Sequence, residues 1–296
     1  MVFGHPTLSR PISALLSGPY PTVTVVASTP RWTDVAGHAR VISAPVRAEL
    51  LDHSSSTSAT PPLVAPSHSS NHLWLEQWLN ADHNIAASSQ ARIKDAVCAQ
   101  LWEASCPGLG KQQTPALMIG ASDVIRSFDR FATPRDHSPI VTSNRGLAGI
   151  DGTISTAWGL QAGLGRPLRV VLGDLSALHD LTGFLHGSLE TEPDLQIVVL
   201  NDHGGAIFGG LEHAKAPRNT LERFFLTPQD ADFQALAHAT GWKFVPIDLR
   251  TPQADTLVPH DATKTSPHAE GLALLADLLS HPIRGRSLVE VLLPEA

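Results

Sequence analysis

The chain has 296 residues, of which 42% are hydrophobic, and a formal net charge of −7 at pH 7. This length is usual for two domains or one large one, and the apolar content is sufficient for a packed core. The basic residues are scattered along the chain. This excludes nucleic acid as the main partner, because a phosphate-binding surface needs clustered Lys and Arg.

Cysteine usage and hydropathy indicate the expected compartment. The two cysteines, Cys98 and Cys106, have the spacing of neither a metal site nor a disulfide framework, so a cytoplasmic protein is expected. No apolar run reaches the ~20 residues that cross a membrane. The N-terminus also lacks the basic and apolar regions of a signal peptide. We therefore expect no membrane span.

The N-terminal part has an irregular pattern. Residues 11–17 favour a helix with proline in its first turn, and residues 22–27 favour a strand. Residues 52–71 are rich in Ser, Thr and Pro, a composition typical of a flexible segment that cannot pack a core. We expect residues 1–88 to form a unit separate from residues 89–296.

Helical and strand-like patterns alternate regularly after residue 90. The predicted helices are 93–104, 123–131, 153–164, a helix running to 185, 230–240 and 269–279. The predicted strands are 117–119, 140–142, 168–172, 197–200, 243–247 and 288–293. This alternation predicts the α/β class, with a parallel sheet covered by helices on both faces.

Two acidic turns follow neighbouring predicted strands. Gly-Asp-Leu-Ser at 173–176 follows the strand 168–172, and Asn-Asp-His-Gly-Gly at 201–205 follows the strand 197–200. Both strands are short and rich in β-branched residues, as in buried parallel sheets. Open α/β sheets bind ligands at the carboxyl edge, where these turns are expected to meet.

Asp174 and Asp202 are therefore candidate metal ligands. Carboxylate oxygens are the ligands that Mg²⁺ prefers, and a backbone carbonyl near Gly204, diphosphate oxygens and water would complete its octahedron. Backbone N–H groups at Leu175 and Ser176 open the next helix and can receive a phosphate oxygen. The alternative is that both aspartates only cap helices.

The two turns and three further stretches resemble one family. The order Gly-Asp, then a spacing of about 26 residues, then Asn-Asp resembles the thiamine diphosphate signature. The surrounding residues resemble the MenD family of 2-succinyl-5-enolpyruvyl-6-hydroxy-3-cyclohexene-1-carboxylate synthases. The motifs are Ser-Asn-Arg-Gly-Leu-Ala-Gly-Ile-Asp-Gly at 143–152, Gly-Asp-Leu-Ser-Ala-Leu-His-Asp at 173–180, Asn-Asp-His-Gly-Gly-Ala-Ile-Phe at 201–208, Glu-Arg-Phe-Phe-Leu-Thr-Pro at 222–228 and Pro-Thr-Leu-Ser-Arg-Pro at 6–11. They match the C-terminal half of the family.

The resemblance implies a fold and a cofactor. Residues 89–296 would be the thiamine diphosphate-binding domain, and residues 1–88 part of a middle domain that includes the flexible 52–71 segment. The implied cofactors are thiamine diphosphate and Mg²⁺, with Mn²⁺ as an alternative ion. The implied metal ligands are Asp174, Asp202 and Gly204. The implied cofactor-binding residues are Ser122, Gly149, Ile150, Gly173, Asp174, Leu175, Ser176 and Ile207.

The resemblance also implies substrates. The family decarboxylates 2-oxoglutarate and adds the succinyl carbanion to isochorismate in menaquinone biosynthesis. Both substrates carry carboxylates, which the planar fork of arginine binds in two places. The implied substrate-binding residues are Arg10, Arg126, Arg145, Ile207 and Leu211. The family's shared sites imply a homo-oligomer, at least a dimer.

Two features depart from the family pattern. Many relatives have Asn at position 202, where Asp202 adds one negative charge while remaining an oxygen ligand. The glutamate that activates the cofactor lies on a pyrimidine-binding domain, and no residue here matches it. We therefore expect a truncated chain without a catalytic residue of its own, which needs a separate pyrimidine-binding domain or chain.

Two other functions stay open at this point. One is a non-catalytic fragment that binds Mg²⁺ and diphosphate. The other is an unrelated α/β nucleotide-binding module, which the absence of a Gly-x-Gly-x-x-Gly fingerprint disfavours for dinucleotides.

Overall fold

The computed structural model separates the chain into two compact units, residues 1–90 and 91–296. The structure describes residues 10–19, 24–26, 37, 39–42, 73, 76–81, 92–106, 108, 114–133, 135, 137–145, 147–250 and 268–294. The segment 52–71, predicted to be flexible, lies outside the described residues.

The first unit contains a helix and a small parallel sheet. Helix α1 spans Arg10–Ser17, which confirms the helix predicted there. Strand β1 (Thr24–Val26) falls within the predicted strand and pairs in parallel with β2 (Arg40–Ile42), which was not predicted.

The second unit is built on a six-stranded sheet in the order β4-β3-β5-β6-β8-β7. All of its strand pairs are parallel, which confirms the predicted fold class. The strands are β3 (Ala116–Ile119), β4 (Val141–Thr142), β5 (Leu168–Gly173), β6 (Leu195–Asn201), β7 (Lys243–Asp248) and β8 (Arg286–Leu292).

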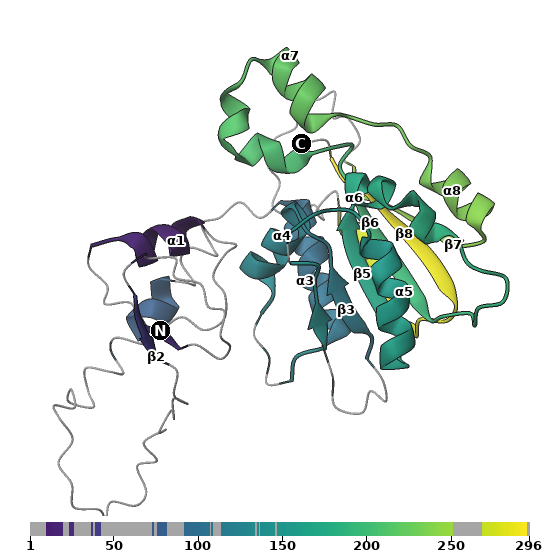
Figure 1. Ribbon diagram of the computed structural model, residues 1–296. Helices are drawn as coiled ribbons and strands as arrows, with labels where there is room; N and C mark the ends of the chain where they lie inside the picture. Colours follow the sequence, from purple (N-terminus) through teal and green to yellow (C-terminus); the bar gives the residue numbers. More distant parts are fainter. Residues whose placement is uncertain are drawn as a thin grey trace, which may run out of the picture. The chain divides into compact units, whose positions relative to one another are not determined.

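Helices cover both faces of this sheet, as Figure 1 shows. One face packs against α3 (Ile93–Ser105), α4 (Asp123–Phe131) and α9 (Ala269–Ser280). The other packs against α5 (Thr153–Leu164), α6 (Asp174–His179) and α8 (Phe233–Thr240). The central strands β5 and β6 present apolar side chains to both faces, because successive strand residues point to opposite sides.

Two predicted helices differ in extent. The helix expected to run to residue 185 ends at His179 and is followed by a 3₁₀ turn, Leu181–Phe184. The helix expected to begin at 230 begins at Phe233, because the Asp232 side chain accepts a hydrogen bond from the Ala235 backbone and caps it.

The connection from β6 to α8 forms a separate layer of short turns. It contains 3₁₀ turns at Ala206–Gly210 and Glu212–Lys215, helix α7 (Arg218–Leu221) and a π turn at Glu222–Leu226. Figure 1 shows this green segment beyond the carboxyl ends of β5 and β6. We call residues 206–226 the cover segment.

The strand order has a switch point between β3 and β5. The chain runs outward from β3 to β4, returns to β5 and then continues to β6 on the other side of β3. The order therefore reverses between β3 and β5. Open α/β sheets bind ligands outside the carboxyl ends of strands at such a switch point.

Within the described part of the chain, no helix is both long enough and apolar enough to span a bilayer.

Gly271 allows α9 to pack closely on the end of β7. A Cβ atom built on Gly271 would lie 2.4 Å from Leu249 Cδ2 and 2.7 Å from the Asp248 carbonyl oxygen. We predict that Gly271→Ala lowers the free energy of unfolding by about 1–3 kcal/mol, because it overpacks this contact. Denaturant unfolding measures the change.

Gly163 in α5 is the matched control, because a Cβ atom there meets nothing within 4 Å. Gly163→Ala should raise stability by about 0.5–1 kcal/mol through lower chain entropy. Equal effects of the two substitutions would contradict the packing described for α9.

Candidate functional site: a carboxylate pair at the carboxyl edge

Asp174 begins α6 immediately after β5 and is 1% exposed. Its Oδ2 accepts a hydrogen bond from Gln229 Nε2 at 2.9 Å. Burial raises the pKa of Asp174, and the charge of Asp202 raises it further, while the hydrogen bonds from Gln229 and the Leu175 backbone oppose the rise. The carboxyl group thus lies within electrostatic reach of Asp202.

The turn after β6 is shaped by Asn201. This side chain donates from Nδ2 to Glu290 Oε1 at 2.7 Å and accepts from the His203 backbone N–H at 3.1 Å. His203 has a positive φ of 58°. The arrangement fixes the turn so that Asp202, which is 8% exposed, lies at the carboxyl edge of the sheet.

Gly204 and Gly205 bring the cover segment against this turn. Gly204 has φ +144°, and a Cβ atom there would lie 2.3 Å from the Leu226 carbonyl oxygen. The Gly205 N–H donates to the same oxygen at 2.6 Å. Only glycines permit this backbone approach, so the cover segment is anchored beside Asp202.

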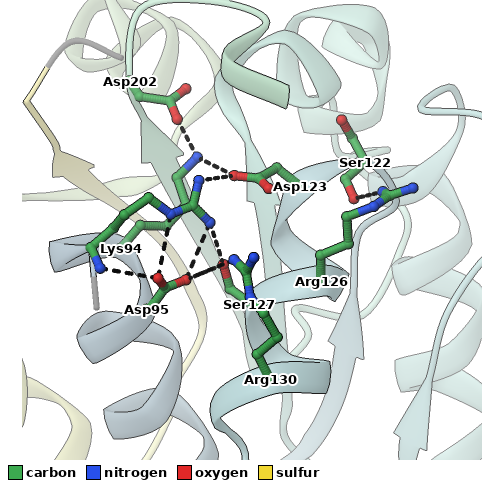
Figure 2. A network of polar contacts seen from close by, with 9 residues as sticks. Lys94, Asp95, Ser122, Asp123, Arg126, Ser127, Arg130 and Asp202 are labelled. Carbon is green, nitrogen blue, oxygen red and sulfur yellow. Dashed lines mark hydrogen bonds and ion pairs between the residues drawn. The ribbon is translucent and has the colours of Figure 1, made fainter. Parts of the chain in front are cut away.

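Lys94 on α3 reaches Asp202 from the other side of the edge. Its Nζ forms a buried ion pair with Asp202 Oδ2 and a second one, at 3.1 Å, with Asp123 Oδ2 (Figure 2). Burial opposes the ammonium charge, but the two carboxylates outweigh it and raise the pKa of Lys94. Lys94 therefore compensates the negative charge of Asp202.

The ion-pair network continues along α3 and α4. Arg92 Nη1 contacts Asp123 Oδ2 at 3.0 Å, and Arg92 also contacts Asp95. Asp95 accepts a 2.7 Å hydrogen bond from Ser127 Oγ. Burial works against both carboxylates, yet Lys94 and Arg92 lower the pKa of Asp123, and hydrogen bonds from Arg92 and Ser127 lower that of Asp95.

Ser122 and Arg126, both predicted site residues, lie together at the start of α4. Ser122 is the N-cap residue and has φ 72° and ψ −131°, an unusual backbone conformation for a residue other than glycine. Its carbonyl oxygen accepts a hydrogen bond from Arg126 Nη1 (Figure 2). Ser122 and Asp174 follow β3 and β5, so they flank the switch point.

The other predicted residues lie in three places. Arg145, Gly149 and Ile150 belong to the loop between β4 and α5 and are exposed or half-buried. Ile207 and Leu211 are half-buried at the beginning of the cover segment. Arg10 is exposed on α1 in the first unit.

The remaining predicted cofactor-binding residues surround Asp174. Gly173 precedes it and is half-buried, and Leu175 and Ser176 follow it in α6. The Leu175 backbone is hydrogen-bonded to the Asp174 carboxyl group. A phosphate oxygen bound by the Leu175 N–H, as predicted, would share this donor with the Asp174 carboxyl group.

The donor set fits a cation that also binds a diphosphate. Among the described residues, no group of three or more His, Cys, Asp or Glu side chains could hold a metal ion. Asp174 and Asp202 alone therefore need further oxygen ligands, which a diphosphate supplies. The Gly204 carbonyl accepts from the Ala206 N–H at 3.0 Å and retains a second lone pair.

Sequence reasoning missed two residues that hold these carboxylates. Lys94 lies 108 residues before Asp202, and Gln229 lies 55 residues after Asp174. Lysine and glutamine are common surface residue types, so neither position stands out in the sequence. Only the fold brings these two side chains to the carboxyl edge of the sheet. The adjacent Thr-Pro at 227–228 marked the neighbourhood of Gln229 but not its role.

Comparison with known proteins identifies sequence relatives over nearly the whole chain. No family model matches it. A 2-succinyl-5-enolpyruvyl-6-hydroxy-3-cyclohexene-1-carboxylate synthase from Renibacterium salmoninarum is 35% identical over 300 residues, which cover 98% of this chain and 46% of the relative. The synthase of the same name from Paenarthrobacter aurescens is 35% identical, with the same coverage of both chains.

A third sequence relative has the same name, and one solved structure is also similar. The synthase of the same name from Kineococcus radiotolerans is 36% identical over 81% of this chain and 41% of the relative. A benzoylformate decarboxylase from Polynucleobacter necessarius has a TM-score of 0.46 and 16% identity, covering 68% of this chain and 33% of that one.

The sheet is that of a parallel α/β protein, and the two buried carboxylates lie at its carboxyl edge, where open α/β sheets usually bind ligands. By sequence, the chain belongs to the family of 2-succinyl-5-enolpyruvyl-6-hydroxy-3-cyclohexene-1-carboxylate synthases. It spans about half the length of the curated relatives that it matches, 46% of the first two.

Lys94 should be important for stability because it compensates the buried carboxylate of Asp202 and the half-buried carboxylate of Asp123. We predict that Lys94→Met lowers the free energy of unfolding by about 3 kcal/mol or more, since it leaves Asp202 buried without its counter-ion. The double variant Lys94→Met/Asp202→Asn should recover most of this loss. Denaturant unfolding of the single and double variants gives the coupling energy.

Lys243→Met, at an exposed lysine of β7, is the control and should change stability by no more than about 0.5 kcal/mol. A double variant no more stable than Lys94→Met would show that Asp202 is not the group that Lys94 compensates.

Proposed function

We propose that this chain provides the diphosphate- and metal-binding part of a thiamine diphosphate-dependent synthase of menaquinone biosynthesis. The reaction would be decarboxylation of 2-oxoglutarate and addition of the resulting four-carbon unit to isochorismate. The observation that carries the proposal is the burial of Asp174 and Asp202 at the ends of adjacent strands, in a chain 35% identical to these synthases over 98% of its length.

In the proposed metal site, Asp174 and Asp202 bind Mg²⁺ through carboxylate oxygens and Gly204 binds it through its carbonyl, with Mn²⁺ as an alternative ion. Gln229 orients Asp174, and Lys94 holds Asp202 by Oδ2, leaving Oδ1 for the metal. A divalent cation would offset the repulsion between two buried carboxylates, which is consistent with the raised pKa of Asp174, caused first by burial and then by Asp202.

The proposed cofactor contacts surround the switch point. Thiamine diphosphate supplies the electron sink for decarboxylation and carbon–carbon bond formation when it is bound. Ile207, half-buried at the start of the cover segment, would support its rings as an apolar neighbour. The residues proposed to contact it are Ser122, Gly149, Ile150, Gly173, Asp174, Leu175, Ser176 and Ile207.

Arginines are proposed to bind the substrate carboxylates. Arg126 lies at the start of α4 beside the switch point, where its guanidinium now donates to the Ser122 carbonyl. Arg145 and Arg10 are assigned the same role from the family motifs. Ile207 and Leu211 would form the apolar wall of this pocket, because both are half-buried in the cover segment.

A second domain is proposed to complete the site. The family resemblance assigns cofactor activation to a glutamate on a pyrimidine-binding domain, in an oligomer of at least two subunits. The buried cysteines Cys98 and Cys106 are compatible with the proposed cytoplasmic location.

Asp174 provides the direct test of cofactor binding. We predict that Asp174→Ala abolishes Mg²⁺-dependent binding of thiamine diphosphate, measured by isothermal titration calorimetry, because it removes a metal ligand. Ligand-free stability should be kept or raised by Asp174→Asn, since burial disfavours the ionised carboxyl group. A residue that only caps α6 would instead cost about 1 kcal/mol when replaced and leave affinity unchanged.

Activity should depend on the second domain. We predict no measurable product when the purified chain is incubated with thiamine diphosphate, Mg²⁺, 2-oxoglutarate and isochorismate. Adding the pyrimidine-binding domain of the Renibacterium relative as a separate chain should yield product, because it supplies the family's glutamate. Product from the chain alone would contradict the need for a partner, whereas absence of cofactor binding would contradict the proposed function itself.

A further inference from the structure

A second charged group lies deep in the sheet, at the edge opposite the carboxylate pair. Arg169 is the second residue of β5 and is 1% exposed. The neighbouring strand residues Leu168, Val170 and Val171 are apolar and fully buried. Arginine is among the residues least often fully buried, because desolvation of its charge is costly. Its presence in a central parallel strand therefore calls for a physical reason.

The hydrogen-bond partners of Arg169 are neutral. Its Nε donates to Gln196 Oε1 at 2.7 Å, and its Nη1 donates to Ser105 Oγ at 3.0 Å. Within the described residues, Nη2 has no hydrogen bond and no carboxylate pairs with the guanidinium. Burial alone lowers the pKa of Arg169 to about 10, so the group is still charged at neutral pH.

No carboxylate of the described residues offsets the charge of Arg169. A buried cation without a counter-ion is unfavourable, and an anion that pairs with it offsets part of the cost.

Arg169 borders a cavity of about 670 Å³, which is within the usual size range of small-molecule sites. None of the described residues that line the cavity is acidic. Its polar lining includes Thr114, Ser280 and His281, and Arg284 lies at its border. Arg284 is 81% exposed and only 3.6 Å from Asp194, a surface pair that contributes little and leaves Arg284 able to turn.

The rest of the wall is apolar. It is formed by Pro115 and Pro167 before strands β3 and β5, by Leu279 in the last turn of α9, and by Pro282 and Ile283 after α9. A ligand here would meet one buried cation at its charged end and aliphatic surface along its body. This combination fits an amphipathic monoanion better than inorganic phosphate, which needs polar contacts on every side.

This cavity is separate from the proposed cofactor site. Arg169 lies near the amino end of β5, and Asp174 follows the carboxyl end of the same strand. Five residues of extended chain place their Cα atoms about 16 Å apart. Fully buried strand residues lie between them, so one small ligand cannot occupy both places.

We propose that the cavity beside Arg169 is a binding site for a small organic carboxylate with a compact apolar body. The carboxylate pairs with the Arg169 guanidinium through Nη2, and the apolar body lies against the proline and aliphatic wall. Ser105 and Gln196 hold the guanidinium in place. The site is independent of the function proposed above.

The test measures binding of benzoate, with benzamide as its neutral analogue and inorganic phosphate as a purely polar anion. Benzoate should raise the melting temperature of the full chain and give a titration signal, because its charge pairs with Arg169. Benzamide and phosphate should bind at least about tenfold more weakly, a difference of roughly 1.4 kcal/mol. Equal binding of benzoate and benzamide, or no binding of benzoate, would overturn the proposal.

Arg169→Leu is the decisive variant. It should be at least as stable as the parent chain without ligand, because an apolar residue replaces an unpaired buried charge, and it should lose the benzoate-induced shift. Arg250→Gln, at an arginine that pairs with Asp248 at the other end of the sheet, is the matched control and should keep the shift. A benzoate shift retained in Arg169→Leu would refute the assignment.

A measurement on the unmodified chain covers the case in which Arg169→Leu does not fold. Photolabelling with 4-azidobenzoate, competed by excess benzoate, should attach to peptides that contain residues 114–115 or 279–284. Competed labelling confined to other peptides would place the carboxylate elsewhere and overturn the proposal.

Discussion

The ion pair between Lys94 and Asp202 is the constraint on which the carboxyl edge depends. The Lys94 ammonium links α3 to the end of β6 through Asp202, and to the start of α4 through Asp123. Two buried carboxylates on adjacent strand ends would otherwise repel each other without a compensating cation. A neutral residue at position 202 would need no such partner, whereas the buried Asp202 carboxylate does. Here the additional charge is balanced from a helix distant in sequence.

The fold followed from local patterns far better than the site did. Helices 123–131 and 153–164 were predicted with the bounds that the structure shows, because caps and periodicity are local properties. The cover segment was not predicted, since its 3₁₀ and π turns are too short for any repeating pattern. The positions of Asp174 and Asp202 followed from strand ends, whereas Lys94 and Gln229 depended on tertiary packing that one sequence does not reveal.

Strand β5 illustrates both the strength and the limit of such patterns. Its apolar run predicted a buried strand correctly even though it contains Arg169. The pattern could not show that this arginine stays buried with neutral partners, because an arginine in a strand usually reaches water at its tip. The same strand therefore has an uncompensated cation near its amino end and a carboxylate in need of a cation at its carboxyl end.

The anchoring of the cover segment has an evolutionary consequence. The contact that closes it joins the Gly205 N–H to the Leu226 carbonyl, and both are backbone atoms. Substitutions between these two points leave that contact chemically unchanged, provided that the glycines remain. The residues from 206 to 226, apart from the proposed contact residues Ile207 and Leu211, can therefore diverge while the carboxylate turn at 201–205 keeps its shape. Selection can therefore change the cover segment without changing the conformation of the turn at 201–205.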